Sequence, residues 1–321
     1  MACGGLGVQG PRPPAGLGIP VRGAAADARA TVVLITRDRR RELLRTLGVM
    51  TALPERPRII VVDNASQDGS ADAASSYPAV RVIRARLNLG AVARNIAVQQ
   101  VTTPYVAFCD DDTWWAAGAL RRAADLLDDY PGLAAVTGRI IVEPAGEEDP
   151  IVRELRDSPV PAPPWLPGPA LMSILAGASM LRIAAFNQVG GFSPRLWLGG
   201  EEELLGMDLA AAGWFMCFAP DVVVHHAAST ARDPRQRRIL GIRNTLWTAW
   251  LRRPLPGALD HTGAVLRSMP KDVASAVAVA RAIVGLPWVL RERRVIPAHV
   301  EAGLRLLAAS QRSSAARRYV G

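Results

Sequence analysis

Short apolar segments alternate with amphipathic ones along the chain from about residue 30. Four of the apolar segments have the pattern of buried strands, and they span residues 31–36, 58–63, 80–84 and 105–109. Their first residues are 22 to 27 positions apart, which is the length of one strand and one helix. The pattern therefore predicts an α/β fold with a mainly parallel sheet, whose ligands bind at the carboxyl ends of the strands.

Helical periodicity fills the intervals between these strands. Leu43, Leu47 and Met50 share one face of a helix that Asp38 is expected to cap. Beyond Gly132 the rhythm loosens, and from residue 231 the chain is helical in pattern. The remaining predicted elements are helices at 91–101, 115–129 and 204–212, strands at 133–142, 214–218 and 222–225, and an exposed proline-rich loop at 158–169.

Positive charge is concentrated in the C-terminal third. The net charge is +9, but residues 1–230 hold 21 arginines against 24 acidic residues, whereas residues 231–321 hold 17 basic residues against 5 acidic ones. No zinc-ligand spacing, helix-turn-helix pattern or interleaving of basic and aromatic residues accompanies this charge, which argues against a nucleic-acid-binding protein. A composition that is 50% hydrophobic excludes a mostly disordered chain, and no uninterrupted apolar run of about 18 residues marks a membrane span.

Cysteine usage and the N-terminal segment favour a cytoplasmic protein. The three cysteines are far apart in the sequence, which predicts buried free thiols in a reducing compartment. Residues 1–29 are rich in glycine, proline and alanine, and they lack the basic start and continuous apolar core of a signal peptide. We expect this segment to be a flexible leader.

Three consecutive carboxylates, Asp110, Asp111 and Asp112, follow the strand at 105–109. Such a cluster repels itself unless a cation or solvent intervenes, and hard oxygen ligands suit Mg²⁺ or Mn²⁺. The alternative is a solvated acidic turn in which Asp112 caps the next helix. The first strand lacks the glycine-rich turns of dinucleotide-binding and P-loop proteins, so hydride transfer and P-loop ATP hydrolysis lose their main support, and a nucleotidyltransferase is disfavoured for the same reason.

Two later segments carry further candidate chemistry. Glu201, Glu202 and Glu203 follow two glycines and precede a helical pattern, where acidic side chains are stabilised by the helix dipole or one of them acts as a general base. His225 and His226 end a strand, and adjacent side chains on a strand point to opposite faces. One histidine of the pair is therefore expected to face the site.

In order along residues 31 to 230, six segments together resemble the family 2 glycosyltransferases of the GT-A fold, in particular bacterial rhamnosyltransferases. They are VVLITRDRRRELLRTL, IIVVDNASQDGS, LNLGAVARN, FCDDDTWWAAGAL, GGFSPRLWLGGEEELLGMDLAAAGW and VVVHHAAST. The resemblance implies a Rossmann-like, mixed but mainly parallel sheet flanked by helices. It also implies an inverting enzyme that moves a sugar from a nucleoside-diphosphate sugar to a hydroxyl acceptor of a glycan, lipid-linked or natural-product type.

The resemblance assigns roles on the donor side of the site. Asp112 corresponds to the direct ligand of Mn²⁺ or Mg²⁺, and Asp110 completes the DxD pair as a second ligand close to the ribose. Asp111 points to the other face of the strand, so its contact with the donor is the weakest of these assignments. The other donor-binding positions implied are Thr36 and Arg37 beside the base, Asp63 at the base or ribose, Asn88 in the loop after the third strand, and Arg94, for which a structural salt bridge is an equal alternative.

On the acceptor side, the resemblance implies a carboxylate base. The family carries Glu-Asp after a glycine here, and Glu202 stands at the aspartate position, so Glu202 is the first choice and Glu201 the second. His225 matches the late histidine as a third metal ligand or diphosphate contact, with His226 as the fallback. The Glu-for-Asp departure keeps a non-catalytic sugar-nucleotide-binding protein open as an alternative.

We therefore expect three parts. They are a leader at 1–29, a catalytic domain at 30–230 divided into a nucleotide-binding half (30–135) and an acceptor half (136–230), and a basic helical extension at 231–321. Residues 227–238 contain four arginines, and this segment is either a flap that closes over the donor diphosphate or an exposed basic connector. The apolar stretch at 273–290 either packs on the catalytic domain or lies on an anionic membrane, at the inner face of the plasma membrane.

Overall fold

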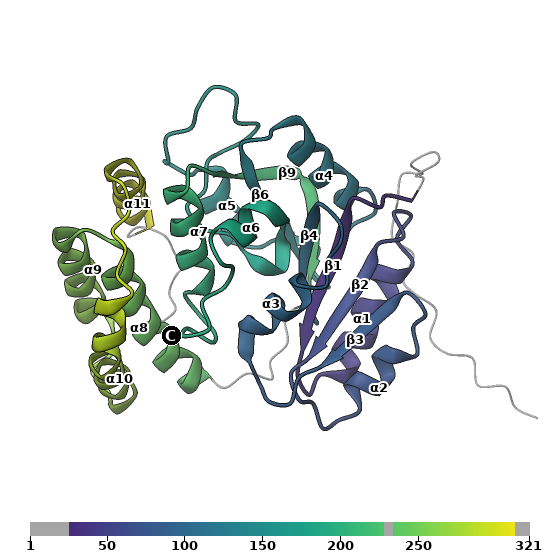
Figure 1. The fold of residues 1–321 in the computed structure, drawn as a ribbon, viewed down its shortest axis with the longest axis horizontal. Coiled ribbons are helices and arrows are strands. Elements are labelled where there is room, and N and C mark those ends of the chain that lie inside the picture. The colour runs from purple at the N-terminus through teal and green to yellow at the C-terminus, as the bar shows by residue number, and fades with distance from the viewer. Residues whose placement is uncertain (1–25, 228–233, 312–321) are drawn as a thin grey trace, which may run out of the picture.

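The computed structural model describes residues 26–227 and 234–311. Within these residues one nine-stranded sheet runs through the molecule in the order β3-β2-β1-β4-β8-β6-β9-β5, and β7 pairs with β6 (Figure 1). The expected leader lies almost wholly outside the described residues, and so does the central part of the expected flap. Residues 234–238 of that flap form the first turn of a long helix.

The four predicted parallel strands are present and begin the sheet. They are β1 (Ala30–Thr36), β2 (Arg58–Asp63), β3 (Val80–Arg84) and β4 (Tyr105–Asp110). Thr36 is in register with Asp63, and Ile35 is in register with Asp110. The polar residues that end β1, β2 and β4 therefore meet at one edge of the sheet, as the sequence predicted.

The rest of the sheet is mixed. β8 (Ser179–Arg182), which the sequence did not predict as a strand, runs antiparallel between β4 and β6 (Leu133–Val142). The two strands expected at 214–218 and 222–225 are one strand, β9 (Phe215–His226), which accommodates a register shift where it passes Gly138 and Arg139 of β6. β5 (Thr113–Trp115) pairs with the end of β9, and β7 (Glu147–Glu148) extends β6.

Helices cover both faces of the sheet. On one face lie α1 (Arg40–Thr51), α2 (Ser70–Ser75) and α4 (Ala119–Asp129). On the other lie α3 (Ala93–Val98) with the 3₁₀ turn Gly90–Val92 before it, α5 (Ile151–Arg156), α6 (Ile183–Gln188) and α7 (Glu201–Ala211). A short 3₁₀ turn, Ala176–Ala178, precedes β8.

Two predictions of helix starts were wrong. Asp38 does not cap α1, because its backbone adopts a positive φ and its carboxylate accepts a hydrogen bond from the backbone N–H of Gln67 instead. The helix expected from residue 115 begins at Ala119, because Trp115 pairs with Val224 as part of β5. Asp112 therefore precedes a strand rather than capping a helix. Cys109 and Cys217 are buried free thiols, as expected.

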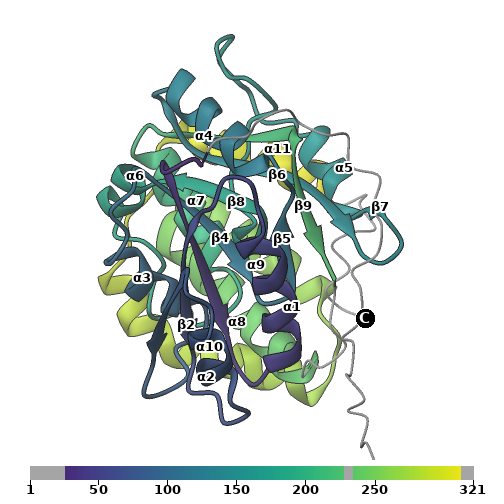
Figure 2. The same ribbon diagram turned by 90° about the vertical axis from the view of Figure 1, so that its right-hand side faces the viewer.

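The C-terminal third is helical, as predicted. α8 (Pro234–Arg252), α9 (Leu255–Ser268) and α10 (Val273–Arg291) pack together, and α11 (Ala298–Gln311) lies beside α7. Viewed from the side of α1 and α2, these helices lie behind the sheet (Figure 2). Leu196, which precedes α7, and Leu204 of α7 share one apolar cluster with Leu246, Trp247 and Val289. The C-terminal helices are thus packed directly onto the segment that contains the glutamates.

Candidate active site

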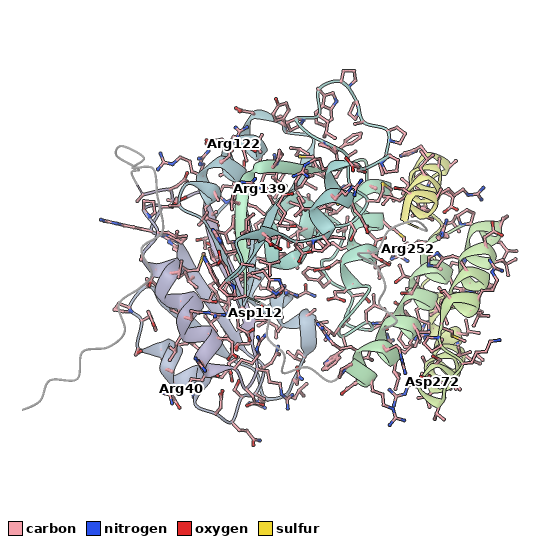
Figure 3. The ribbon with its side chains drawn as sticks, turned by 180° about the vertical axis from the view of Figure 1, so that it is seen from behind. Arg40, Asp112, Arg122, Arg139, Arg252 and Asp272 are labelled. Atoms are coloured by element: carbon pink, nitrogen blue, oxygen red, sulfur yellow. The ribbon has the colours of Figure 1, made fainter. Side chains whose placement is uncertain are left out.

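The three aspartates after β4 occupy a tight turn between β4 and β5. The backbone N–H of Asp110 donates to Thr113 Oγ1 at 2.8 Å, and that hydroxyl lies 3.1 Å from the carbonyl oxygen of Gly177. Asp112 lies near the centre of the molecule, whereas Asp272 lies on the C-terminal helices (Figure 3). The three carboxylates do not have the same partners, because Arg94 pairs with Asp110 whereas Arg39 pairs with Asp111 and Asp112.

Asp111 faces the inside of the β1–α1 region. Thr36 Oγ1 donates to Asp111 Oδ2 at 2.9 Å, and Arg39 pairs with Asp111 Oδ1. Burial raises the pKa of Asp111 to about 7, despite the opposing effect of the Arg39 charge. The sequence analysis expected Asp111 and Thr36 to contact the sugar-nucleotide donor, but in the structure their side chains are hydrogen-bonded to each other.

Arg39 is a site residue that the sequence reasoning missed. Its Nη2 also lies 2.9 Å from Asp112 Oδ2, so one guanidinium bridges two neighbouring carboxylates. Asp112 itself is fully buried. The signal for this residue was weak, because Arg39 stands in a run of arginines from which periodicity cannot select one.

The pairing of β5 with β9 brings the histidines to the aspartates. Thr113 is in register with His226, and His226 Nε2 lies 3.8 Å from Asp112 Oδ1. His225 points elsewhere: its Nδ1 lies 2.8 Å from Glu143 Oε1, and its ring stacks on Trp114. The structure thus places His226, the second of the two candidates, beside Asp112.

Asp112 and His226 carry the oxygen and nitrogen donors that suit a divalent cation. Asp112 Oδ1 and His226 Nε2 are close enough together to be adjacent ligands of one ion. Among the described residues no cluster of three or more histidine, cysteine, aspartate or glutamate side chains is suited to hold a metal. Mg²⁺ and Mn²⁺ commonly need only one or two protein ligands when substrate phosphates complete the shell, so the two groups fit such an ion.

Arg94 of α3 contacts the acidic cluster. Its side chain is nearly buried, with Nη2 2.5 Å from Asp110 Oδ1 and its guanidinium over the rings of Phe108 and Phe192. The other carboxylate oxygen of Asp110 faces Gly177, where a Cβ would lie only 2.8 Å from Oδ2. Arg94 therefore fixes one oxygen of Asp110, and the absence of a side chain at residue 177 leaves room at the other.

Glu201 and Glu202 begin α7 beside this pair. Gly199 and Gly200 both have positive φ, which directs the chain into the helix. The backbone N–H of Ala176 donates to Glu202 Oε1 at 2.6 Å, whereas Glu201 is buried and its Oε2 has no hydrogen-bond partner.

Burial raises the pKa of both glutamates. The pKa of Glu202 reaches about 8, because the charge of Glu201 adds to the effect of burial. Arg94 lowers and Asp110 raises the pKa of each glutamate, which places the two glutamates within electrostatic reach of the Arg94–Asp110 pair. A carboxylate with a raised pKa is a stronger base, so this end of the site is suited to proton removal.

The other expected donor contacts lie around the ends of β1 and β2. Asp63 is buried, with Oδ2 accepting from the Ser66 backbone N–H at 3.1 Å and Oδ1 unbonded. Arg37 is exposed and lies 3.4 Å from Asp38. Asn88 shapes its own turn, because its side-chain oxygen accepts from the Gly90 backbone N–H. At this edge, therefore, Arg37 presents an exposed charge, Asp63 has one buried oxygen without a hydrogen-bond partner, and the side chain of Asn88 is used locally.

Asn244 of α8 is a second residue that the sequence reasoning missed. It is fully buried, and its amide Nδ2 lies 2.8, 3.0 and 2.5 Å from the carbonyl oxygens of Leu196, Leu198 and Gly199. No motif marks it, because a single asparagine in a helix carries no pattern. The C-terminal extension therefore fixes the loop from which Glu201 and Glu202 emerge.

We expect Asn244→Asp to weaken both the fold and the activity. Aspartate keeps the shape but loses the donors and faces three carbonyl oxygens, so the free energy of unfolding should fall by about 2–3 kcal/mol. Denaturant unfolding and initial rates would measure the two effects. Thr248→Val is the matched control, because Thr248 is buried on the same helix and its hydroxyl has no hydrogen-bond partner. Unchanged stability of Asn244→Asp would contradict this role.

Comparisons with known proteins show the family of this chain. A family model described as glycosyl transferase family 2 matches residues 31–186. The chain is 30% identical over 275 residues to an N-acetylglucosaminyl-diphospho-decaprenol L-rhamnosyltransferase of Mycobacterium tuberculosis, covering 71% of this chain and 89% of that protein.

Two solved structures share the fold. A mannosyltransferase from Pyrobaculum calidifontis, in complex with GDP-Man and Mn²⁺, aligns with a TM-score of 0.54 at 20% identity over 90% of this chain and 88% of its own. GalNAc-T7 with UDP, GalNAc and Mn²⁺ aligns with a TM-score of 0.57 at 14% identity over 83% of this chain and 56% of its own. The predicted GT-A architecture is confirmed.

Proposed function

Because this chain belongs to glycosyl transferase family 2, and is therefore an enzyme that uses a nucleotide-sugar donor, we propose that it transfers the sugar to a hydroxyl acceptor with inversion of the anomeric carbon. One observation carries the proposal. Asp112 of the turn after β4 lies beside His226, Asp110 of the same turn pairs with Arg94, and the charges of Arg94 and Asp110 both act on Glu202. An anion-binding end and a proton-accepting end thus belong to one site.

Asp112 and His226 are the residues that would hold Mn²⁺ or Mg²⁺. The solved mannosyltransferase and GalNAc-T7 structures both contain Mn²⁺, which supports a divalent ion here. When bound, such an ion supplies charge neutralisation for the leaving diphosphate. Arg39 holds the second oxygen of Asp112 and so fixes the orientation of that carboxylate.

Glu202 would accept the proton of the acceptor hydroxyl. The Ala176 N–H fixes one of its oxygens, which leaves the other to face the acceptor. Proton removal makes the hydroxyl oxygen a better nucleophile, and the nucleoside diphosphate departs from the opposite face of the sugar. Glu201, which is the alternative base, raises the proton affinity of Glu202 through its own charge. Asp63 at the end of β2 and Arg37 directly after β1 would contact the nucleobase or ribose of the donor.

The acceptor and the location are proposed from the relative and from the C-terminal helices. The mycobacterial relative's name describes a diphospho-lipid-linked sugar as its acceptor. We propose a lipid-linked sugar acceptor of cell-wall or polysaccharide biosynthesis for this chain too. The enzyme would then work in the cytoplasm at the inner face of the plasma membrane, with the basic C-terminal third in contact with anionic lipid and with no role for nucleic acid.

A donor screen tests the proposed function. The full chain is mixed with uridine-, guanosine- and deoxythymidine-diphosphate sugars, with and without Mn²⁺, and both the thermal unfolding midpoint and donor hydrolysis are measured. We expect the donors that carry one particular nucleobase to raise the thermal unfolding midpoint in a Mn²⁺-dependent manner. Among them, the donor with the matching sugar should be hydrolysed. With a diphospho-lipid-linked sugar added as the acceptor, NMR of the glycosylated product would show an anomeric configuration opposite to that of the donor. Stabilisation by a nucleotide with no turnover of any donor would identify a non-catalytic sugar-nucleotide-binding protein instead.

A further inference from the structure

A groove of about 470 Å³ runs between α8 and α10 of the C-terminal helices. Its walls combine two arginines, two tryptophans and small or branched apolar residues. The residues that matter here are Arg243 and Trp247 of α8 and Val277, Arg281, Val284 and Trp288 of α10. No acidic side chain lines it.

The aromatic wall of the groove is rigidly built. The rings of Trp247 and Trp288 meet edge to face with centroids 5.1 Å apart, and Trp247 Nε1 donates to the Ala282 carbonyl at 2.9 Å. Gly285 permits this contact, because a Cβ there would lie 2.3 Å from the Trp247 ring. The Arg243 guanidinium stacks 4.3 Å above the same ring. The position of the Arg243 charge is therefore fixed by packing.

The two arginines form a concentration of positive charge. Burial and the neighbouring Arg281 both lower the pKa of Arg243, so the two guanidiniums repel each other. Within the described part of the chain, neither of them forms an ion pair with a carboxylate. Guanidinium groups match the oxygens of phosphate in shape and charge, and they bind it through paired N–H donors.

The helix that carries Arg281 also presents apolar side chains to solvent. Val284 is 81% exposed and Ile283 is 60% exposed, next to Arg281 on α10. α10 has the length and hydropathy of a membrane-spanning helix, but it packs against α8 with a third of its apolar window buried and carries Arg281 at its middle. Apolar residues beside arginines are typical of a helix that lies on a membrane surface.

The groove lies next to the loop that precedes the catalytic glutamates. Arg243 Nη2 donates to the Leu196 carbonyl at 3.2 Å, and the Arg195 guanidinium lies 5.4 Å from the centroid of the Trp288 ring. Asn244, the next residue of α8, holds the same loop. A membrane in contact with the groove would therefore lie beside the acceptor end of the site.

We propose that this groove binds the phosphate of an anionic phospholipid between Arg243 and Arg281, with the exposed side chains of α10 inserted among the lipid chains. The inference deepens the proposed function, since it would keep the enzyme where a lipid-linked acceptor is found. It names a surface and a ligand class that neither the family nor the donor site requires. Arg281 and Val284 are the residues that test it, because both are exposed and neither contacts the donor or base residues.

Vesicle sedimentation tests the proposal with the full chain. Vesicles of phosphatidylcholine alone are compared with vesicles that also contain phosphatidylglycerol, at low and high salt. We expect binding to the anionic vesicles only, and a loss of roughly tenfold in affinity for Arg281→Glu and for Val284→Asp. The control variants are Arg153→Glu on α5 and Leu306→Asp on α11, which likewise replace an exposed arginine with glutamate and an exposed aliphatic residue with aspartate. Both should bind to vesicles as the wild type does.

Separate readouts keep this proposal distinct from the proposed function. Donor hydrolysis should be unchanged in Arg281→Glu and Val284→Asp, because the donor site is intact. Equal binding to neutral and anionic vesicles, or wild-type binding by both groove variants, would overturn the groove assignment whether or not the chain transfers sugar. If inorganic phosphate bound to the chain and anionic vesicles did not, the groove assignment would also be overturned, because the ligand would then be a free anion.

Discussion

Asp112→Asn is expected to lower the rate of sugar transfer by at least about 100-fold and to abolish its dependence on Mn²⁺. Asparagine keeps the shape and one oxygen but loses the charge that Asp112 directs toward His226. Initial rates measured over a range of Mn²⁺ concentrations would show this as a loss of the metal-dependent increase. Removal of the ion from the wild type with a chelator should have the same effect.

Three further variants belong to this experiment, and two of them, Asp111→Asn and His225→Gln, are controls. Asp111→Asn removes a charge from the same turn and the same Arg39, but its carboxylate is bonded to Thr36, so Mn²⁺ dependence should persist. His226→Gln should raise the Mn²⁺ concentration required, and His225→Gln should not, because His225 faces Glu143. If Asp112→Asn retained wild-type Mn²⁺ dependence, or if the two histidine variants behaved in the reverse order, the assignment of the metal ligands would be wrong.

Glu202→Gln is expected to lower the maximal rate by about 10²–10⁴-fold with little change in donor affinity. Glutamine still accepts the hydrogen bond from the Ala176 N–H, so the loop should keep its shape, but it cannot take a proton. The maximal rate and the KM for donor, measured separately, would show the loss in the first quantity alone. A larger loss in Glu201→Gln than in Glu202→Gln would transfer the role of base to Glu201.

The pH profile provides an independent test of the same base. The base must be deprotonated to act, and the pKa of Glu202 is about 8, so the rate should rise with pH and level off above that value. Glu201→Gln removes the neighbouring charge that raises this pKa, and the rising limb should therefore move to lower pH. A rising limb that stayed in place in Glu201→Gln would show that the two carboxyl groups do not titrate together.

The alternation of apolar and polar residues was sufficient to predict β1 to β4 and the edge at which they end. Parallel strands in register must bring the residues after them to one edge, so Asp63 and Asp110 could be placed together from spacing alone. Short segments whose residues suit both a helix and a strand were harder to predict. Residues 113–115 form a strand because β9 is available to pair with them, and β9 is remote in the sequence.

Charge pairing was visible in the sequence only as composition. The run of arginines at 39–41 marks positive charge, but only folding shows that Arg39 reaches two carboxylates more than 70 residues away. The same is true of Asn244, whose side chain meets a loop that lies more than 40 residues earlier in the chain. Neither contact has a local signature, because both depend on the packing of separate elements.

By itself the sequence determined the α/β architecture, the family, and the segments that carry the acidic and histidine residues. These properties depend on periodicity and local spacing, which a linear chain displays directly. Only the tertiary structure decided that His226 rather than His225 lies beside Asp112, that Arg39 and Asn244 support the site, and that α8 and α10 form a basic, aromatic groove. The reason is physical: strand register sets which face a side chain occupies, and helix packing sets which distant residues share a surface.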